Sequence, residues 1–136
     1  MDTIFTKIIK GEIPCYKIAE NEHCFAFLDI SPLSQGHTLV VPKIQEDYIF
    51  DLDDELLAEL TIFSKKVAAA IRKIVPCERI AVAVIGLDVP HAHIHLIPIQ
   101  QDSILDFKAP RVKLSAAEMS SLATEINKAS TPKSIF

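Results

Sequence analysis

Residues 90–99 of the chain, PHAHIHLIPI, contain three of its five histidines at alternate positions: His91, His93 and His95. Alternate side chains of a β-strand point to the same face, so the three imidazoles are expected on one surface. The residues between them are alanine, isoleucine and leucine, which would face the other side. This alternation predicts a strand with one face on a hydrophobic core and the other lined with imidazole.

The neighbouring stretches predict further antiparallel strands. RIAVAVIG (79–86) is typical of a buried strand, and the GLDVP that ends at residue 90 is typical of the turn into the histidine strand. Upstream, CFAFLDI (24–30) and HTLVVP (37–42) are strand-like runs joined by SPLSQG. Two such runs joined by a Pro/Gly/Ser turn predict an antiparallel pair, which places His37 at the mouth of a strand.

Three helices are predicted around these strands. FTKIIKGEIP (5–14) indicates a short helix that its glycine and proline end. In residues 53–74 apolar side chains recur at steps of three and four, the pattern of a long amphipathic helix. Ser115 and Glu118 form an S-x-x-E capping box before a C-terminal helix near 115–128. Strands and helices in this order predict an α+β domain around an antiparallel sheet.

Length and composition limit the class of protein. The 136 residues suit a single domain over 1–136, and a net charge of -4 offers no general attraction to nucleic acid or an anionic membrane. The three cysteines show no C-x-x-C spacing and follow no signal-like N-terminus, so we expect free thiols and a cytoplasmic location. No apolar run approaches the roughly 18 residues that span a bilayer.

Three hypotheses account for the clustered histidines. The first is a solvated strand face without a function. The second is a metal site, because alternating strand histidines can converge on zinc, although no set of supporting ligands is evident. The third is covalent catalysis at phosphorus, in which a neutral imidazole attacks while its other nitrogen keeps a proton against an acceptor. A neighbouring protonated imidazole would bind the phosphoryl oxygens and supply a proton to the leaving group. The strict spacing favours the third hypothesis.

The sequence also resembles a known family. HAHIHLI (91–97) resembles the signature of the histidine-triad (HIT) family, in which three histidines alternate with hydrophobic residues and two more hydrophobic residues follow. The likeness continues over residues 4–43 and covers about 3–99, which leaves 100–136 as a C-terminal extension. The resemblance implies a HIT-like α+β fold: a five-stranded antiparallel sheet, a long central helix and a C-terminal helix, with the sheet extended across a homodimer.

The resemblance further implies nucleotide chemistry without a cofactor. The implied reaction is hydrolysis or transfer at the α-phosphorus of nucleoside phosphoramidates, dinucleoside polyphosphates or adenylylated compounds. His93 would be the nucleophile and form a nucleotidyl-histidine intermediate. The backbone carbonyl of His91 would hold its tautomer, His95 would contact the phosphate, and His37 would complete the proton network.

A purine nucleotide is the implied substrate, and the resemblance assigns residues to it. Asp29 would accept hydrogen bonds from the ribose hydroxyls, and the turn that contains Gly86 and Asp88 would lie at the phosphate. The base pocket would be formed by Phe5, Ile8, Ile13, Phe27, Ile30 and Leu39. Periodicity alone makes several of these ordinary core residues, and turn capping is the ordinary use of an aspartate such as Asp29. His23 is expected to be a surface histidine.

Two departures from the family pattern affect these expectations. Many relatives bind zinc through a C-x-x-C pair and a further histidine, whereas this chain has Thr3, Thr6 and Gln45 at those positions. We therefore expect no structural zinc.

The second departure is in the turn before the histidines. Active relatives usually have Gly-Gln followed by Ser or Thr there, and an asparagine in the preceding strand, where this chain has Ala83 and Val84. This turn contains Leu87 and Asp88, and an ionised carboxylate close to a phosphate is repelled. Either Asp88 points away and Gly86 donates through its backbone, or Asp88 selects an amine leaving group, or catalysis is slow. A nucleotide-binding or scaffold protein on the same fold is therefore the alternative function.

Overall fold

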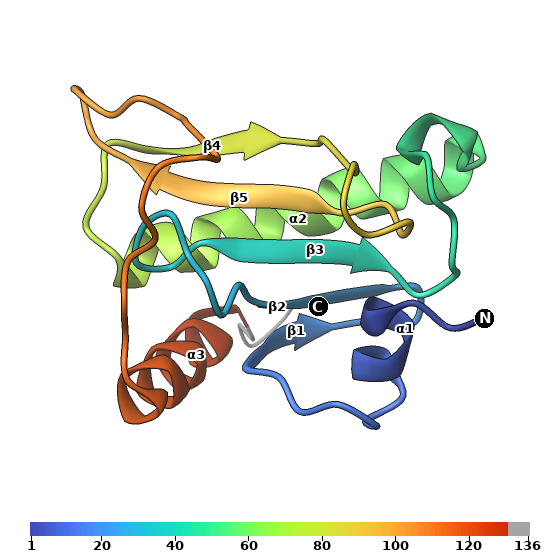
Figure 1. The fold of residues 1–136 in the computed structure, drawn as a ribbon, viewed down its shortest axis with the longest axis horizontal. Coiled ribbons are helices and arrows are strands. Elements are labelled where there is room, and N and C mark those ends of the chain that lie inside the picture. Colours follow the sequence, from blue (N-terminus) through green and yellow to red (C-terminus); the bar gives the residue numbers. More distant parts are fainter. Residues whose placement is uncertain (131–136) are drawn as a thin grey trace.

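The computed structural model describes residues 1–130 and centres on a five-stranded sheet with strand order β1-β2-β3-β5-β4 (Figure 1). Every pair of neighbouring strands is antiparallel, which confirms the predicted α+β class. The predicted C-terminal extension is described as far as residue 130. In chain order the elements are α1 (Ile4–Ile9), β1 (Lys17–Glu20), β2 (Cys24–Leu28), β3 (Thr38–Pro42), the 3-10 helix η1 (Ile49–Asp51), α2 (Asp54–Ile74), β4 (Arg79–Ala83), β5 (Ile94–Ile99) and α3 (Ala116–Ser130).

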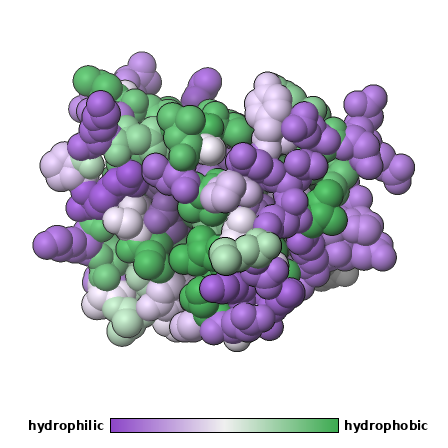
Figure 2. Space-filling view, turned by 45° about the vertical axis from the view of Figure 1, so that its right-hand side comes forward, coloured by the Kyte–Doolittle hydropathy of each residue, from purple (hydrophilic) through white to green (hydrophobic). Residues whose placement is uncertain are grey.

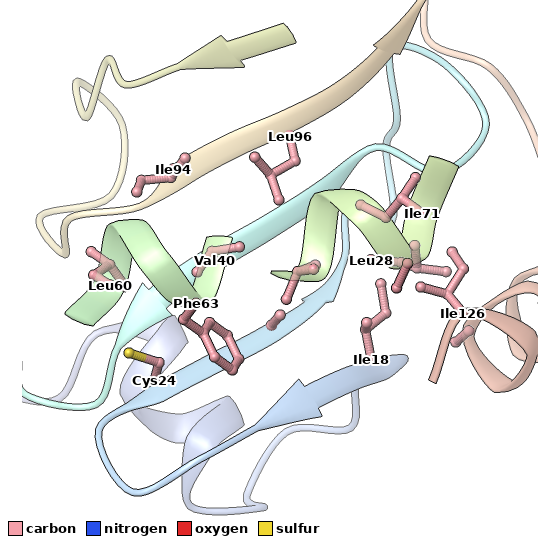
Figure 3. Close-up of a cluster of buried hydrophobic side chains, with 14 of the residues drawn as sticks. Ile18, Cys24, Leu28, Val40, Leu60, Phe63, Ile71, Ile94, Leu96 and Ile126 are labelled. Carbon is pink, nitrogen blue, oxygen red and sulfur yellow. The ribbon is translucent and has the colours of Figure 1, made fainter. Parts of the chain in front are cut away.

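The main hydrophobic core lies between one face of the sheet and the helices α2 and α3. Figure 3 shows Val40, Ile94 and Leu96 of the sheet beside α2, with Ile126 of α3 at one end of the cluster. Burial of a side chain of this size contributes about 1.5–3 kcal/mol to folding. The predicted apolar stripe of α2 is confirmed, since its buried apolar residues include Leu60, Phe63, Val67 and Ile71.

The opposite face of the sheet carries a second, smaller cluster. Phe25 and Phe27 of β2 and Leu39 of β3 pack there with Phe5 of α1. Leu39 is directly opposite His95 in the β3–β5 register, so this face is also the histidine face. The alternation in the histidine stretch therefore has the predicted result, because Ala92, Ile94 and Leu96 belong to the main core instead.

The sequence predicted a buried strand over residues 79–86, and β4 differs from that prediction in both length and burial. It ends at Ala83, and each of its five residues is exposed or half-buried. β4 is at the edge of the sheet and pairs only with β5, so one side of the strand has no neighbour within residues 1–130. Val82 lies in register with the core residue Leu96 but is 65% exposed. The apolar sequence of β4 predicted a buried strand. Because β4 lies at the edge of the sheet, a single chain leaves its side chains partly exposed.

Two further boundaries differ from the sequence prediction. β1 was not predicted from the residue pattern, because KIAE is short and contains only one fully buried side chain, that of Ile18. The histidine strand β5 begins at Ile94, so His91 and His93 precede the ladder and only His95 lies within it. The two earlier histidines therefore depend on contacts other than strand pairing for their positions.

Local signals at helix ends and turns agree with the prediction. The capping box before α3 is confirmed, since the Ser115 N–H donates to Glu118 Oε1 at 2.8 Å and the Glu118 N–H donates to Ser115 Oγ at 3.1 Å. Gly36, just before β3, has a φ of 93°, and a Cβ there would lie 2.9 Å from Val75 Cγ2. Among residues 1–130 no helix has both the length and the apolar composition needed to cross a bilayer.

Candidate active site

Four of the five histidines gather on the face of the sheet opposite α2. The ring centroids of His93 and His95 are 5.0 Å apart, and those of His37 and His95 are 5.2 Å apart. His37 directly precedes β3, and the others come from β5 and the segment before it. His37 and His91 are 0% exposed, His93 is 7% exposed and His95 is 9% exposed. The hypothesis of a solvated histidine face is therefore wrong.

His91 is held between a carbonyl and a hydroxyl. Its Nε2 lies 2.9 Å from the carbonyl oxygen of Pro42, which can only accept, so Nε2 carries the proton. Its Nδ1 is then an acceptor, and the hydroxyl of Thr3 donates to it at 2.8 Å. Burial lowers the pKa of His91, the hydrogen bond to Pro42 opposes that shift, and the nearby His93 adds to it. A neutral ring with its proton on Nε2 fits all of these contacts.

His93 has the opposite tautomer because of the backbone of His91. Its Nδ1 lies 2.8 Å from the carbonyl oxygen of His91, so this nitrogen must donate a proton. The Nε2 of a neutral His93 consequently has a lone pair. The predicted arrangement of this carbonyl and this ring is therefore present, and it leaves one imidazole nitrogen able to act as a nucleophile.

A hydrogen-bond relay that starts at the backbone N–H of Leu33 sets the tautomers of His37 and His95. The backbone N–H of Leu33 donates to Nδ1 of His37 at 3.0 Å, so the proton of a neutral His37 is on Nε2. That nitrogen donates to Nδ1 of His95 at 2.9 Å. The Nε2 of His95 therefore carries an N–H, in contrast to the lone pair at the same position of His93.

Burial keeps this second pair neutral. It lowers the pKa of His37 to about 3 and that of His95 to about 4, and the positive charge of Arg111 contributes to both shifts. At neutral pH the His37 contact with Asp29 Oδ2 at 3.6 Å is therefore not an ion pair. The structure thus supports a neutral His95 that differs from His93 in its tautomer. The sequence had instead suggested a protonated imidazole beside the nucleophile.

Asp29, His37 and His95 are close enough to be considered as metal ligands, since one ligand atom from each lies within 4.8 Å of the others. Coordination through Nε2 of a neutral His37 would move its proton to Nδ1, which faces the N–H of Leu33. Two donors would then oppose each other. These three residues do not fit a resident metal ion.

The positions that hold cysteine and histidine in zinc-binding relatives form a different cluster here. The Thr6 hydroxyl donates to Gln45 Oε1 at 2.7 Å, and the Thr3 hydroxyl donates to His91. Two hydroxyls and an amide oxygen are not the thiolate and imidazole donors that structural zinc requires. This cluster does not fit zinc, and its hydrogen-bond donors and acceptors are already paired with one another.

The predicted nucleotide-binding residues do not all lie in one environment. Phe5, Phe27 and Leu39 are buried in the cluster of this face, and the Phe5 ring centroid lies 5.0 Å from that of His93. Ile8 packs on the edge of this cluster, whereas Ile13 is half-buried outside it. Ile30 is 79% exposed. The first three residues therefore belong to the core of this face, and the isoleucines provide the more accessible surface.

Asp29 caps the turn that follows β2, as its alternative interpretation predicted. Its Oδ1 accepts from the backbone N–H of Ser31 at 2.8 Å. Burial raises the pKa of Asp29, and the Ser31 N–H together with the charge of Arg111 opposes that shift. The other carboxylate oxygen, Oδ2, points toward the His37 ring at 3.6 Å. Capping therefore uses one oxygen and leaves the second next to the histidines.

The turn before the histidines contributes to the lining of an apolar groove of about 870 Å³. Gly86 has a φ of 71° and lines the groove together with Leu87 and His93. Asp88 is exposed and does not line it. The groove lies on the α2 side of the sheet and is a different surface from the histidine face, so the orientation of Asp88 relative to the phosphate stays a prediction.

Two site neighbours had no signal in the sequence. The Phe107 ring centroid lies 4.8 Å from that of His95, and Arg111 lies 5.9 Å above the Phe107 ring. Arg111 also donates to the carbonyls of Ser31 and Phe107. Both residues belong to the irregular segment between β5 and α3, which descends past the end of β5 in Figure 1. Neither spacing nor periodicity distinguishes them, because the segment has no regular structure.

Comparisons with known proteins identify the family of this site. The HIT domain family matches residues 10–102, so the chain belongs to the HIT family. It is 38% identical over 133 residues to adenosine 5′-monophosphoramidase hnt1 of Schizosaccharomyces pombe, covering 93% of this chain and 97% of the relative.

Solved structures agree with this assignment. A HIT-like protein from Bartonella henselae has a TM-score of 0.82 and 29% identity, covering 94% of this chain and 96% of that one. A zinc-bound histidine triad family protein from Mycobacterium smegmatis has the same TM-score and 26% identity, covering 96% of this chain and 94% of that one. The HIT-like fold that the sequence resemblance implied is therefore confirmed.

Proposed function

We propose that the protein is a HIT-family hydrolase that cleaves nucleoside phosphoramidates at the α-phosphorus through a covalent intermediate on His93. One observation carries the proposal: the His91 carbonyl fixes the proton of His93 on Nδ1, which leaves the Nε2 lone pair for attack. The likeness to an adenosine monophosphoramidase supports the choice of substrate class.

In the first step, His93 Nε2 forms a bond to the α-phosphorus as the P–N bond breaks, and the leaving nitrogen, which has taken up a proton from solvent, departs as ammonia or a neutral amine. The N–H on Nε2 of His95 donates to a phosphoryl oxygen, where negative charge develops. His37 keeps this N–H in place by donating to the other nitrogen of His95. In the second step, water attacks the phosphorus, the P–Nε2 bond breaks, one proton of the water passes to solvent, and the nucleoside monophosphate leaves His93 with its Nε2 lone pair restored.

The nucleotide binds across the same face in this proposal. Asp29 accepts from the ribose hydroxyls through Oδ2, the oxygen that does not cap the Ser31 turn. The half-buried Ile8 and Ile13 and the exposed Ile30 provide apolar surface for the base, above the buried Phe5, Phe27 and Leu39. Gly86 supplies a backbone N–H at the phosphate, while Asp88 stays in solvent.

The working unit is a homodimer in this proposal, with a second copy on the edge of β4. The apolar groove runs between α2 and β4, and Val82, Val84 and Ile85 along its margin are exposed. Figure 2 shows hydrophobic side chains interspersed with hydrophilic ones along the upper margin of the molecule, the height at which β4 lies in Figure 1. An unpaired apolar edge strand is a surface that pairing with another chain would cover.

Turnover with adenosine 5′-phosphoramidate, P¹,P⁴-di(adenosine) tetraphosphate and adenylyl sulfate tests the activity and its leaving-group class. Wild type should release AMP most rapidly from the phosphoramidate. His93→Ala should still bind AMP by calorimetry but release none, and His23→Ala is the matched control because His23 is exposed. Wild type that binds AMP without turning over any of the three compounds would favour the binding-protein alternative.

The dimer has a separate test. Light scattering should give twice the chain mass for wild type and the single-chain mass for Val82→Lys, which puts a charge in the groove. Ile104→Lys is the matched control, because Ile104 is equally apolar and 87% exposed but does not line the groove. A wild type that is monomeric at micromolar concentration contradicts this part of the proposal.

A further inference from the structure

We propose that Thr3, Thr6 and Gln45 are positioning residues for the nucleophile, acting through His91. The inference rests on the proposed function and goes further, because it assigns a role to three residues that do not touch the reacting atoms. In the proposed chain of contacts, Thr3 holds the His91 ring, the His91 backbone holds Nδ1 of His93, and the Nε2 lone pair of His93 points to the substrate.

The three residues and His91 form one continuous hydrogen-bond cluster. Thr3 Oγ1 lies 2.8 Å from His91 Nδ1 and 3.2 Å from Thr6 Oγ1. Gln45 Oε1 accepts from both sides, from the Thr6 hydroxyl at 2.7 Å and from the Thr3 backbone N–H at 2.8 Å. Gln45 Nε2 donates to the Met1 carbonyl at 2.8 Å. Both functional groups of the Gln45 amide are therefore used.

The direction of each hydrogen bond follows from the groups that have only one role. The Pro42 carbonyl can only accept, which places the His91 proton on Nε2 and makes Nδ1 an acceptor. The Thr3 hydroxyl must therefore donate to His91, and it accepts from the Thr6 N–H at 3.1 Å. The Thr6 hydroxyl uses its single proton on Gln45, so Thr3 is the donor to His91.

The location of the cluster explains why the nucleophile needs it. β5 begins at Ile94, so neither His91 nor His93 is held by the strand ladder. Backbone contacts anchor the adjoining residues, since the Ala92 N–H donates to the Glu46 carbonyl at 2.7 Å. The Thr3 cluster adds a side-chain anchor that joins the start of α1, the loop after β3 and the segment before β5. His91 is 0% exposed, so water cannot replace a lost hydroxyl without a rearrangement.

Kinetics of Thr3→Val and Thr3→Ser test the role of the hydroxyl. Valine keeps the shape of threonine and removes the donor, whereas serine keeps the donor. For adenosine 5′-phosphoramidate we expect kcat to fall roughly ten- to a hundredfold in Thr3→Val, with KM changed less than about threefold. Thr3→Ser should stay within about threefold of wild type. Thr124→Val, an exposed hydroxyl on α3, is the matched control.

A spectroscopic readout separates positioning from general destabilisation. Imidazole ¹⁵N chemical shifts distinguish a protonated ring nitrogen from one with a lone pair. In wild type, His93 should be protonated on Nδ1, and in Thr3→Val a second population protonated on Nε2 should appear. An unchanged kcat, or a reduced kcat with an unchanged His93 spectrum, would overturn the inference.

Two more variants cover the case in which Thr3→Val does not fold, since Thr3 also caps α1. Thr6→Val and Gln45→Met leave that cap in place and should shift the His93 spectrum in the same direction by a smaller amount. Unchanged His93 spectra in both variants contradict the inference. The tautomer measurement needs no turnover, so a wild type that hydrolyses no phosphoramidate would contradict the proposed function and still leave the positioning role decided by the spectra.

Discussion

The two hydrogen-bond relays of the site use the same residue type and produce opposite results. On one side, the Pro42 carbonyl accepts from the His91 ring and the His91 carbonyl accepts from Nδ1 of His93, which leaves a lone pair on His93 Nε2. On the other side, the N–H of Leu33 acts on His37 and His95, and the relay ends in an N–H on His95 Nε2. The backbone group that faces each ring, the His91 carbonyl for His93 and the Leu33 N–H for His37, therefore leaves a lone pair on His93 Nε2 and an N–H on His95 Nε2, and in the proposed function the first attacks and the second donates.

The largest effect is expected where this difference is tested directly, by His93→Gln and His95→Gln. A glutamine amide can place an N–H near the position of imidazole Nε2 but offers no nucleophilic lone pair. His93→Gln should therefore lose turnover by at least roughly 10³-fold. His95→Gln should lose less than His95→Ala, which removes a donor to the phosphoryl group and is expected to cost roughly 10²- to 10³-fold in kcat. Steady-state rates with adenosine 5′-phosphoramidate give the comparison, and equal losses in the two glutamine variants would contradict it.

A smaller loss is expected when the donor relay is broken one residue from the reacting atoms. His37→Phe keeps an aromatic ring but removes the proton donated to His95 Nδ1 and the acceptor of the Leu33 N–H. The tautomer of His95 is then no longer fixed, and kcat should fall about tenfold, less than the roughly 10²- to 10⁴-fold of a group that itself transfers the proton. The His95 ¹⁵N spectrum should show a mixture of tautomers. A single unchanged tautomer would mean that His37 does not control His95.

The pH dependence of the free energy of unfolding should also reflect the neutral His37–His95 pair. The lowered pKa values of His37 and His95, about 3 and about 4, mean that the unfolded chain binds protons more readily than the folded chain below about pH 6.5. Their contribution to stability is therefore complete above that pH and is lost as the pH falls toward 4. Each group changes the free energy of unfolding by up to about 1.4 kcal/mol per pH unit. Urea denaturation between pH 7 and pH 4.5 should show a shallower dependence in His37→Phe than in wild type, and parallel curves would contradict this origin.

The smallest effect is expected for Asp88, in the turn where the sequence departs from the family pattern. Asp88 is exposed, so water can solvate its carboxylate in the folded protein. Asp88→Ser should change kcat/KM by less than about threefold, within the range of a surface substitution. Relative rates over a set of amine and phosphate leaving groups should stay the same. A changed preference for amines would show instead that the carboxylate selects the leaving group.

The sequence predicted those features that depend on periodicity and local chemistry. The stripe of α2, the capping box at Ser115 and the separation of imidazole from apolar side chains in the histidine stretch are all present in the structure. β1 was missed because a four-residue strand with one fully buried side chain has almost no periodic signal. The prediction that β4 is buried was wrong because hydropathy cannot distinguish a central strand from an edge strand.

The family resemblance indicated the site residues and the His91 carbonyl that faces Nδ1 of His93, but not the proton positions of His37, His91 and His95. The gathering of His37 with the three clustered histidines agrees with the family resemblance. The tautomers of His37 and His95 follow from the N–H of Leu33, four residues before His37, and that of His91 follows from the Pro42 carbonyl and the Thr3 hydroxyl, which are far from it in the sequence. Such contacts follow from tertiary structure, so no spacing rule indicates them. Phe107 and Arg111 escaped prediction for the same reason.

Intact-mass spectrometry after rapid mixing with adenosine 5′-phosphoramidate tests the central claim most directly. Wild type and His95→Gln should both pass through a species heavier than the free chain by one adenylyl group, and peptide mapping should place that group on His93. His93→Gln should not form this species. Rapid release of AMP by wild type without any adduct, or an adduct on a different histidine, would contradict the assignment of the lone pair to His93.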